Sequence, residues 1–343
     1  MMEDKKTLDL DFVRSQFPAF SEPTLKGWAF FENAGGSYPC EQVVTRLTDF
    51  YMKNKVQVNY PYPASTLAGQ LMENSYKRMA EALNVEENEI HFGPSTTQNV
   101  YVLAQAMIPM WKNGDELIVS CQDHEANSGA WRRLESRGLK IVEWHVNEKS
   151  GLLELDELEA LLSEKTVMVA YPHCSNVIGY VNPVKEITKK IHECGALSVV
   201  DGVGYAPHGF PDLKDLQADI YLFSLYKTFG PHLGLMYVKD ELASKMENQS
   251  HFFKEGIKRS MLTPAGPDHA QIASASGILD YFDLVYKHHF SEERSPIAKT
   301  HLLNAMFQEH EKNLMEGLFD FLRSRDDIQI LGTDTVDQRA PII

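Results

Sequence analysis

The chain has 343 residues, of which 43% are hydrophobic and 24% are charged, a composition that excludes a disordered or fibrous protein. Its formal net charge of −15 predicts an acidic surface that repels phosphate backbones, so we expect no nucleic-acid partner. No apolar run approaches the roughly 18 residues that cross a membrane, and residues 1–6 lack the apolar stretch of a secretory signal. The four cysteines are too few and too scattered for a disulfide framework. We therefore expect a cytoplasmic protein without a membrane partner.

In chain order, the first 20 residues mix charged and aromatic side chains and predict an arm or a first helix. From residue 90 onward, short apolar runs alternate with helical patterns, which is typical of βαβ units and a mostly parallel sheet. Four apolar residues from Val100 to Met107 share one face of a predicted helix, and a second helix begins after Pro183 and ends at Gly195. The predicted strands cover residues 115–120, 166–170, 196–200, 220–223 and 234–238, and we expect the last two to pair.

The pattern changes beyond about residue 290, where a long helix over about 296–323 is followed by an apolar segment, 328–331, and by the start of a strand near 340–343. We expect three parts. They are an N-terminal arm over 1–25, a large domain over 26–288, and the start of a smaller α+β domain over 289–343 that would continue beyond Ile343.

Two charged side chains follow neighbouring predicted strands, at the edge of an open α/β sheet where ligands bind. Asp201 follows an apolar strand, where an acid is partly desolvated and needs a cationic partner to stay charged. Lys227 follows the next strand, flanked by Tyr226 and Phe229, where an amine can become a Schiff-base nucleophile. Taken alone, Asp201 could equally cap a turn and Lys227 could be a surface lysine. Pyridoxal phosphate requires both groups, a lysine for its aldehyde carbon and a carboxylate for its pyridine nitrogen.

Other segments match the remaining needs of this cofactor. The turn over 93–98 precedes a predicted helix, so the hydroxyls of Ser95, Thr96 and Thr97 meet free backbone N–H groups there, which suits a phosphate. A simple N-cap is the alternative for Ser95 or Thr96. His124 could cover the flat ring or only satisfy a structural hydrogen bond. Asn176 could bond the ring hydroxyl or a substrate carboxylate, or it could form an Asx-turn.

Four segments in this order resemble the class V aminotransferase family of fold-type-I pyridoxal-phosphate enzymes, in particular its cysteine desulfurase-like and selenocysteine lyase-like members. The segments are Asp123–Asn127, Ser175–Gly179, Val199–Gly202 and Ser224–Lys227. The resemblance runs from about Phe31 to the end of the chain. It implies an α/β fold with a mostly parallel sheet of the seven-stranded type, flanked by helices, and a smaller C-terminal α+β domain that is incomplete here.

The resemblance also implies roles for individual residues. Lys227 would form the Schiff base and move the Cα proton, Asp201 would pair with the pyridine nitrogen, and His124 would stack on the ring as the third catalytic residue. The residues expected to hold the phosphate are Ser95, Thr96, Thr97, Ser224 and Tyr226. Asn176 is expected near the ring hydroxyl and the substrate carboxylate, and Asn33 on the substrate side. Residues 264–267 resemble a loop that reaches the neighbouring subunit's phosphate, which implies a homodimer with shared active sites. No metal is expected.

The chain departs from the family pattern in three respects. Relatives often have a glutamine three residues after the aspartate, where this chain has Gly204, and a histidine before the lysine, where it has Tyr226. The arginine that clamps the substrate carboxylate and, in desulfurases, the persulfide-forming cysteine would lie beyond Ile343. None of the four cysteines matches that cysteine, and Cys194, on a helix core face, is expected to be a buried inert thiol.

The sequence therefore predicts an enzyme that acts on an amino acid through a Lys227 Schiff base and removes sulfur or selenium by β-elimination. A pyridoxal-phosphate-dependent aminotransferase or epimerase of the same family is an alternative, because both share the first step. An inactive binding module with the same fold is an alternative of another class. A nicotinamide-binding protein and a Ser-His-Asp hydrolase are disfavoured, because no early strand leads into a G-x-G-x-x-G turn and no G-x-S-x-G elbow occurs.

Overall fold

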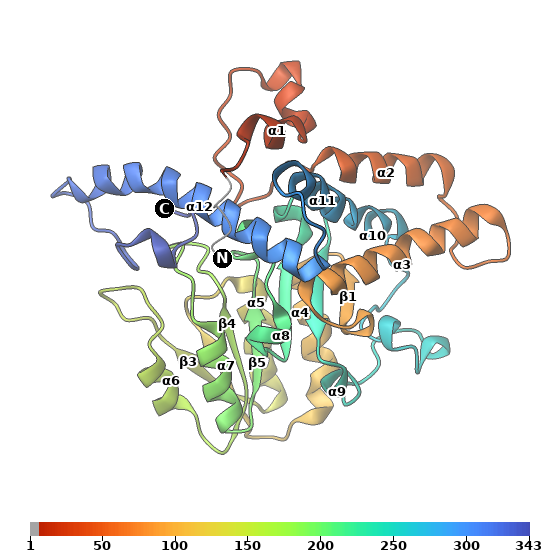
Figure 1. Cartoon of the computed structure of the whole chain (residues 1–343). Helices are drawn as coiled ribbons and strands as arrows, with labels where there is room; N and C mark the ends of the chain where they lie inside the picture. Colours follow the sequence, from red (N-terminus) through yellow and green to blue (C-terminus); the bar gives the residue numbers. More distant parts are fainter. Residues whose placement is uncertain (1–6) are drawn as a thin grey trace.

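The computed structural model describes residues 7–343. Its centre is one seven-stranded sheet with the strand order β1-β7-β6-β5-β4-β2-β3 (Figure 1). β7 runs antiparallel to both of its neighbours, and all other neighbouring strands are parallel. The strands are β1 (Ile90–Gly93), β2 (Glu116–Ser120), β3 (Lys140–Trp144), β4 (Thr166–Pro172), β5 (Leu197–Asp201), β6 (Ile220–Ser224) and β7 (Gly234–Val238). The predicted mostly parallel sheet is confirmed, and so is the pairing of β6 with β7.

Helices cover both faces of the sheet, because successive strand residues point to opposite sides and both sets are apolar. Val200 of β5 belongs to the core cluster that includes residues of α7, α10 and α11, whereas Val199 packs with α4 and α5. The helices are α1 (Leu10–Ser15), α2 (Glu41–Lys53), α3 (Pro63–Leu83), α4 (Thr96–Met107), α5 (Glu125–Arg132), α6 (Leu155–Leu161), α7 (Val184–Glu193), α8 (Leu213–Leu216), α9 (Asp240–Ala243), α10 (His269–Ala275), α11 (Gly277–His289) and α12 (Pro296–Arg323).

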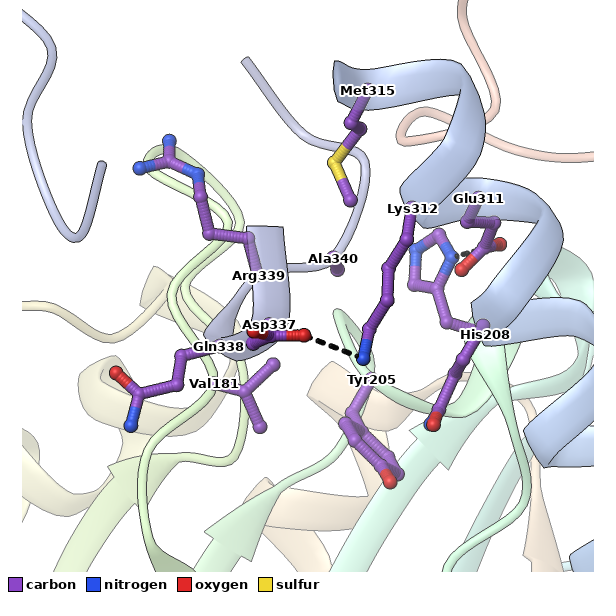
Figure 2. A pocket seen from close by; sticks show the side chains of 11 residues that line it. Val181, Tyr205, His208, Glu311, Lys312, Met315, Asp337, Gln338, Arg339 and Ala340 are labelled. Carbon is purple, nitrogen blue, oxygen red and sulfur yellow. Dashed lines mark hydrogen bonds and ion pairs between the residues drawn. The ribbon is translucent and has the colours of Figure 1, made fainter. Parts of the chain in front are cut away.

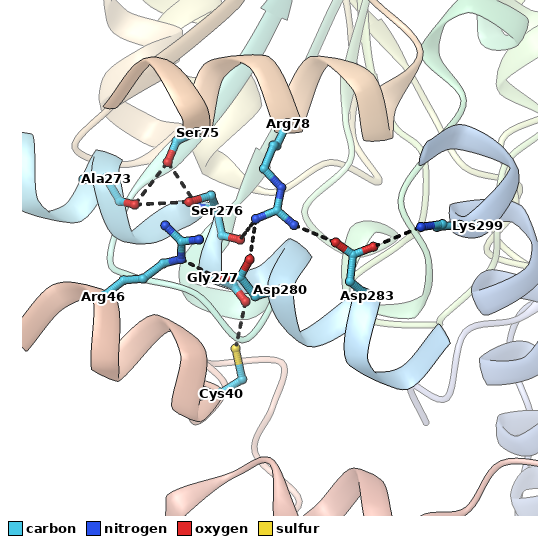
Figure 3. A network of polar contacts seen from close by, with 10 residues as sticks. All are labelled: Cys40, Arg46, Ser75, Arg78, Ala273, Ser276, Gly277, Asp280, Asp283 and Lys299. Atoms are coloured by element: carbon cyan, nitrogen blue, oxygen red, sulfur yellow. Dashed lines mark hydrogen bonds and ion pairs between the residues drawn. The ribbon is translucent and has the colours of Figure 1, made fainter. Parts of the chain in front are cut away.

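A network of ion pairs joins α2, α3, α11 and α12 (Figure 3). The carboxylate of Asp280 on α11 accepts hydrogen bonds from Arg46 on α2 and from Arg78 on α3. Arg78 also binds Asp283 at 2.9 Å, and Lys299 of α12 lies 3.7 Å from the same Asp283 carboxylate. Burial opposes ionisation of Asp280, but the two guanidinium groups outweigh it and lower the pKa of this carboxyl below its ordinary value. Opposite charges therefore hold the helices behind the sheet together.

Several predicted elements have the expected bounds and others do not form. The long helix is α12, and the helix between Pro183 and Gly195 is α7, although its C-cap residue Cys194 is half-buried rather than fully buried. The strand expected near 340–343 is not formed, and residues 328–331 are not a strand either. The chain there forms an isolated bridge between Tyr180 and Arg339, with backbone hydrogen bonds from Val181 to Gln338 and from Ala340 to Gly179, each at 2.9 Å.

Two further expectations concern the chain's ends and its boundaries. The absence of a secretory signal was inferred from residues 1–6, which lie outside the described residues. The domain boundaries near residues 25 and 288 stay predictions. None of the helices within 7–343 combines the length and the apolar character that a membrane crossing requires.

Candidate active site

The site lies where the parallel strands end. Asp201 is the last residue of β5 and is 4% exposed, and Lys227 closes a 3₁₀ turn, Leu225–Lys227, that follows the neighbouring strand β6. Burial raises the pKa of Asp201, whereas the backbone N–H of Val203, at 2.7 Å, and the charges of His124 and Lys227 lower it. The charges of Lys227 and His124 therefore act on the Asp201 carboxylate at the carboxyl ends of the parallel strands.

The N-terminus of α4 has the features of a phosphate cradle. Ser95 is the N-cap residue, and its hydroxyl accepts the Gln98 N–H at 3.2 Å. The next hydroxyl, Thr96 Oγ1, is buried and has no hydrogen-bond partner within residues 7–343, and the same holds for Asn99 Nδ2 in the first turn. Thr97 is exposed. An unpartnered buried hydroxyl is costly unless a ligand meets it, so Thr96 together with the free helix N–H groups fits an anion.

A glycine keeps this cradle open. Gly234 of β7 lies so close to the start of α4 that a Cβ atom there would be 2.6 Å from the backbone nitrogen of Thr96. Any side chain at position 234 would therefore displace the cradle. The glycine therefore leaves the backbone N–H groups at the start of α4 in place, where they could bind the phosphate of pyridoxal phosphate.

His124 is fixed at the N-terminus of α5, directly after β2. Its Nδ1 accepts the backbone N–H of Ala126 at 3.0 Å, so in the neutral ring the proton is on Nε2. The side chain is exposed, which leaves a ring face free for stacking. Structural capping and cofactor stacking are therefore compatible at this residue.

The loop after β4 carries Asn176, which is exposed. Ser175 rather than Asn176 shapes this turn, because its hydroxyl accepts the N–H groups of Val177 and Ile178, each at 3.3 Å. The Asn176 amide is not needed for the turn. Facing this loop is Gly204, where a Cβ atom would lie 2.7 Å from the carbonyl oxygen of Cys174. The position at which relatives often carry glutamine thus has no room for a side chain.

The N-terminal segment is tied to the loop that carries Lys227. Ser37 donates its N–H to the carbonyl of Tyr226 at 3.1 Å, and its hydroxyl accepts the N–H of Phe229 at 2.8 Å. The Tyr226 ring packs against Gly36, where a Cβ atom would lie 2.6 Å from the tyrosine hydroxyl. The turn over 31–36 with the exposed Asn33 therefore lies beside the lysine loop. Ser224 is half-buried at the end of β6.

Two cavities lie near these elements. One of about 260 Å³ opens between the segment after β5, α12 and the chain near 337–340 (Figure 2). Two polar pairs line it, His208 with Glu311 and Lys312 with Asp337, each at 2.8 Å, together with the guanidinium of Arg339, which donates to the carbonyls of Leu331 and Thr333. The other, of about 670 Å³, is lined by residues that include 92–94 before α4 and the loop 263–268.

Within residues 7–343, no group of three or more His, Cys, Asp or Glu residues could hold a metal ion.

One residue of this region was missed by the sequence argument. Asp123 immediately precedes His124, and its carboxylate accepts the backbone N–H of His124 at 2.9 Å and the Asn127 side-chain amide at 2.6 Å. The signal was available, because Asp123 also follows a strand end.

Comparisons with known proteins agree with this geometry. Residues 29–256 match the family model "Aminotransferase class-V". The aminotransferase-like protein FGM3 of Gibberella zeae is 33% identical over 98% of this chain and 81% of its own length. The cysteine desulfurase-like protein ustD of Aspergillus flavus is 32% identical over 73% of this chain, and the match spans only 57% of that relative.

A solved structure shows the same fold. The apo cysteine desulfurase from Thermococcus onnurineus NA1 superposes with a TM-score of 0.79 at 21% identity, over 99% of this chain and 82% of that one. At this identity the likeness concerns the fold alone. With the family match and the sequence relatives, it identifies this chain as a member of the class V aminotransferase family, a cysteine desulfurase-like, pyridoxal-phosphate-dependent enzyme of fold type I.

Proposed function

We propose that the protein acts on an amino acid and removes sulfur or selenium from its β-carbon, as a cysteine desulfurase or a selenocysteine lyase would. The observation that carries the proposal is the meeting of Lys227 and Asp201 at the ends of β6 and β5, where the ammonium charge acts on the buried carboxylate. The name of the relative ustD, cysteine desulfurase-like protein, supports this choice of reaction.

The cofactor would be held at both ends. Asp201 would accept a hydrogen bond from the protonated pyridine nitrogen. Burial raises the pKa of this carboxyl, and the charges of His124 and Lys227 act in the opposite direction. The residues that would bind the phosphate are Ser95, Thr96, Thr97, Ser224 and Tyr226. The His124 ring would cover one face of the cofactor. Asn176 and Asn33 would contact the substrate, because both are exposed beside the site.

When bound, pyridoxal phosphate supplies an electron sink that weakens the bonds at the amino acid's Cα. Lys227 is the residue that would hold the cofactor through its aldehyde carbon, and its amine would serve as the base for the Cα proton of the amino acid. His124 would keep its Nε2 proton available, because its Nδ1 is occupied by the Ala126 N–H.

Transamination is the second candidate, because FGM3 is named an aminotransferase-like protein. It shares the removal of the Cα proton but keeps the β-substituent on the substrate. The organic products therefore separate the two reactions: alanine, with the sulfur or selenium left at the zero oxidation level, for the desulfurase or lyase, and a keto acid with an intact side chain for the aminotransferase.

The test begins with the purified protein and added pyridoxal phosphate. We expect a visible absorbance band that borohydride bleaches, that Lys227→Ala abolishes and that Lys214→Ala, at an exposed lysine of α8, leaves unchanged. Cysteine, selenocysteine and alanine are then titrated while the spectrum and the products are followed. A protein that stays colourless with excess cofactor would contradict the proposal. A band that no amino acid perturbs would instead identify an inactive binding module.

We also propose that two copies associate as a homodimer around the larger cavity. The loop that lines this cavity follows a segment with two outward-facing aromatic residues, Phe252 at 85% and Phe253 at 66% exposure. Exposed aromatic residues are typical of a surface that another protein covers. Sedimentation equilibrium tests this, and the mass of a single chain would contradict it.

A further inference from the structure

The loop that carries Lys227 contains a residue in an unfavourable backbone conformation. Phe229, two residues after the lysine, has a φ of 62°, in the left-handed region that a bulky side chain rarely adopts. The other non-glycine residues with a positive φ within 7–343 have polar side chains, and they are Asn59, Asn84 and Gln217. Such a conformation persists only where the surrounding structure holds it, and it often occurs at active sites. The contacts of Phe229 therefore show what holds this loop in place.

The N-terminal segment binds both the N–H and the carbonyl of Phe229. The N–H donates to the hydroxyl of Ser37 at 2.8 Å, and the carbonyl accepts the backbone N–H of Cys40 at 3.0 Å. Cys40 is the fully buried N-cap residue of α2, and its thiol donates to the carbonyl of Gly277 of α11 at 3.7 Å. The strained residue is thus bonded to a segment that is itself anchored on two helices.

Ser37 also contacts the residue on the other side of the lysine. Its backbone N–H donates to the carbonyl of Tyr226 at 3.1 Å, and its hydroxyl donates to the same carbonyl at 3.3 Å. Tyr226 directly precedes Lys227, and Phe229 follows it by two positions. A single half-buried serine therefore connects the two ends of the short stretch that contains the lysine.

The inner side of the loop is fixed to the end of β6. Thr228 is fully buried, and its hydroxyl donates to the carbonyl of Ser224 at 2.6 Å. Its backbone N–H donates to the carbonyl of Leu225 at 3.0 Å. These bonds involve the residue before Phe229 and leave the Phe229 N–H to Ser37.

Aromatic packing holds the side chain of Phe229. Its ring lies edge-on to those of Phe17 and Tyr281, with centroid distances of 5.4 and 5.9 Å. These contacts fix the ring, whereas the peptide groups of Phe229 depend on the hydrogen bonds to Ser37 and Cys40. The Ser37 hydroxyl is therefore the side-chain group that supports the left-handed backbone.

We propose that Ser37 is a positioning residue for Lys227, whose hydroxyl holds the loop in the conformation from which the lysine amine reaches the cofactor's aldehyde carbon. Lys227 ends the turn Leu225–Lys227 and is half-buried, so the direction of its side chain depends on the backbone on either side. Without the hydroxyl, the Phe229 N–H would lose its acceptor and the backbone would relax from the left-handed region, turning the lysine with it. The inference rests on the proposed function, in which Lys227 bonds the cofactor.

The test measures how fast the lysine captures the cofactor. Cofactor-free wild-type, Ser37→Ala and Ser37→Thr proteins are mixed with pyridoxal phosphate, and the growth of the borohydride-sensitive absorbance band is followed by stopped flow. We expect Ser37→Ala to form the band about tenfold more slowly, because a small misplacement of a reacting group is costly. Ser37→Thr keeps the hydroxyl and should behave like wild type. The matched control is Ser21→Ala, at an exposed serine of the same N-terminal segment, which should leave the rate unchanged.

A second measurement uses the cofactor-free protein alone. Hydrogen exchange of backbone amides is followed by mass spectrometry for peptides that cover residues 224–233. If Ser37 holds the loop, exchange there should be about tenfold faster in Ser37→Ala and unchanged in Ser21→Ala. Thermal unfolding then separates positioning from a purely structural tie, which would lower Tm but leave the rate of band formation, measured well below Tm, equal to that of wild type.

The outcomes are distinguishable. Equal rates of band formation in wild type and Ser37→Ala would overturn this inference and leave the proposed function intact, and so would a Ser37→Thr variant as slow as Ser37→Ala. A wild-type protein that forms no band would overturn the proposed function and this inference with it. If Ser37→Ala does not fold, Ser37→Cys, whose thiol is a weaker acceptor for the Phe229 N–H, provides the same comparison.

Discussion

Replacing Gly204 by glutamine would install the side chain that relatives often carry three residues after the aspartate. In this chain the replacement should be harmful. The first atom of the new side chain would lie 2.7 Å from the carbonyl oxygen of Cys174, 3.4 Å from its carbonyl carbon and 3.5 Å from its Cβ. The nearest of these atoms is backbone, in a loop held by the bridge between Cys174 and Val181, and cannot rotate away as a side chain would.

The cost follows from this overlap. Gly204 does not have a positive φ, so the substitution is penalised by crowding and not by backbone conformation. Overpacking of this kind costs about 1–3 kcal/mol. At about 2 °C per kcal/mol for a large domain, Tm should fall by about 2–6 °C for Gly204→Ala and at least as much for Gly204→Gln.

The assay is thermal unfolding of both variants with and without pyridoxal phosphate. The control is Gly317→Ala on α12, where a Cβ atom meets nothing within 4 Å and the better helix propensity of alanine should add about 0.5–1 kcal/mol. If Gly204→Gln is as stable as wild type and binds the cofactor more tightly, the loop has room for the glutamine. The close approach of residues 204 and 174 would then be refuted.

Two other substitutions test the cradle and the helix network. Thr96→Val removes the unpartnered buried hydroxyl, so it should weaken pyridoxal phosphate binding about tenfold without lowering cofactor-free stability, as equilibrium dialysis and thermal unfolding would show. Equal cofactor affinity would contradict a phosphate contact at Thr96. Asp280→Asn leaves Arg46 and Arg78 without their shared carboxylate and should cost about 2–3 kcal/mol in urea unfolding, because these groups are largely but not fully buried. Asp283→Asn, at a carboxylate 42% exposed, should cost less than about 1 kcal/mol, and equal losses in both would contradict this account.

The parts of the site that lie at strand ends could be predicted from the sequence. Asp201 and Lys227 follow apolar runs, and the carboxyl ends of parallel strands lie together on one side of the sheet.

The two strands that were not predicted, β1 and β3, are the outermost strands of that sheet. Edge strands need only one apolar face, so the polar residues Lys140 and Glu143 in β3 obscure the pattern.

Contacts between distant segments could not be predicted in the same way. The sequence identified Ser95 and Thr96 as hydroxyls at a helix start, but only the packing assigns the cap to Ser95 and leaves Thr96 free. The crowding at Gly204 depends on a carbonyl thirty residues away in the chain.

The central claim is that Lys227 is the amine that bonds the cofactor opposite Asp201. The most direct measurement is reduction of the pyridoxal-phosphate-loaded protein with borohydride, followed by proteolysis and mass spectrometry of the labelled peptide. This account predicts a single stable pyridoxyl group on Lys227, within the segment that follows β6. Labelling at another lysine, or a label spread over many surface lysines, would contradict it.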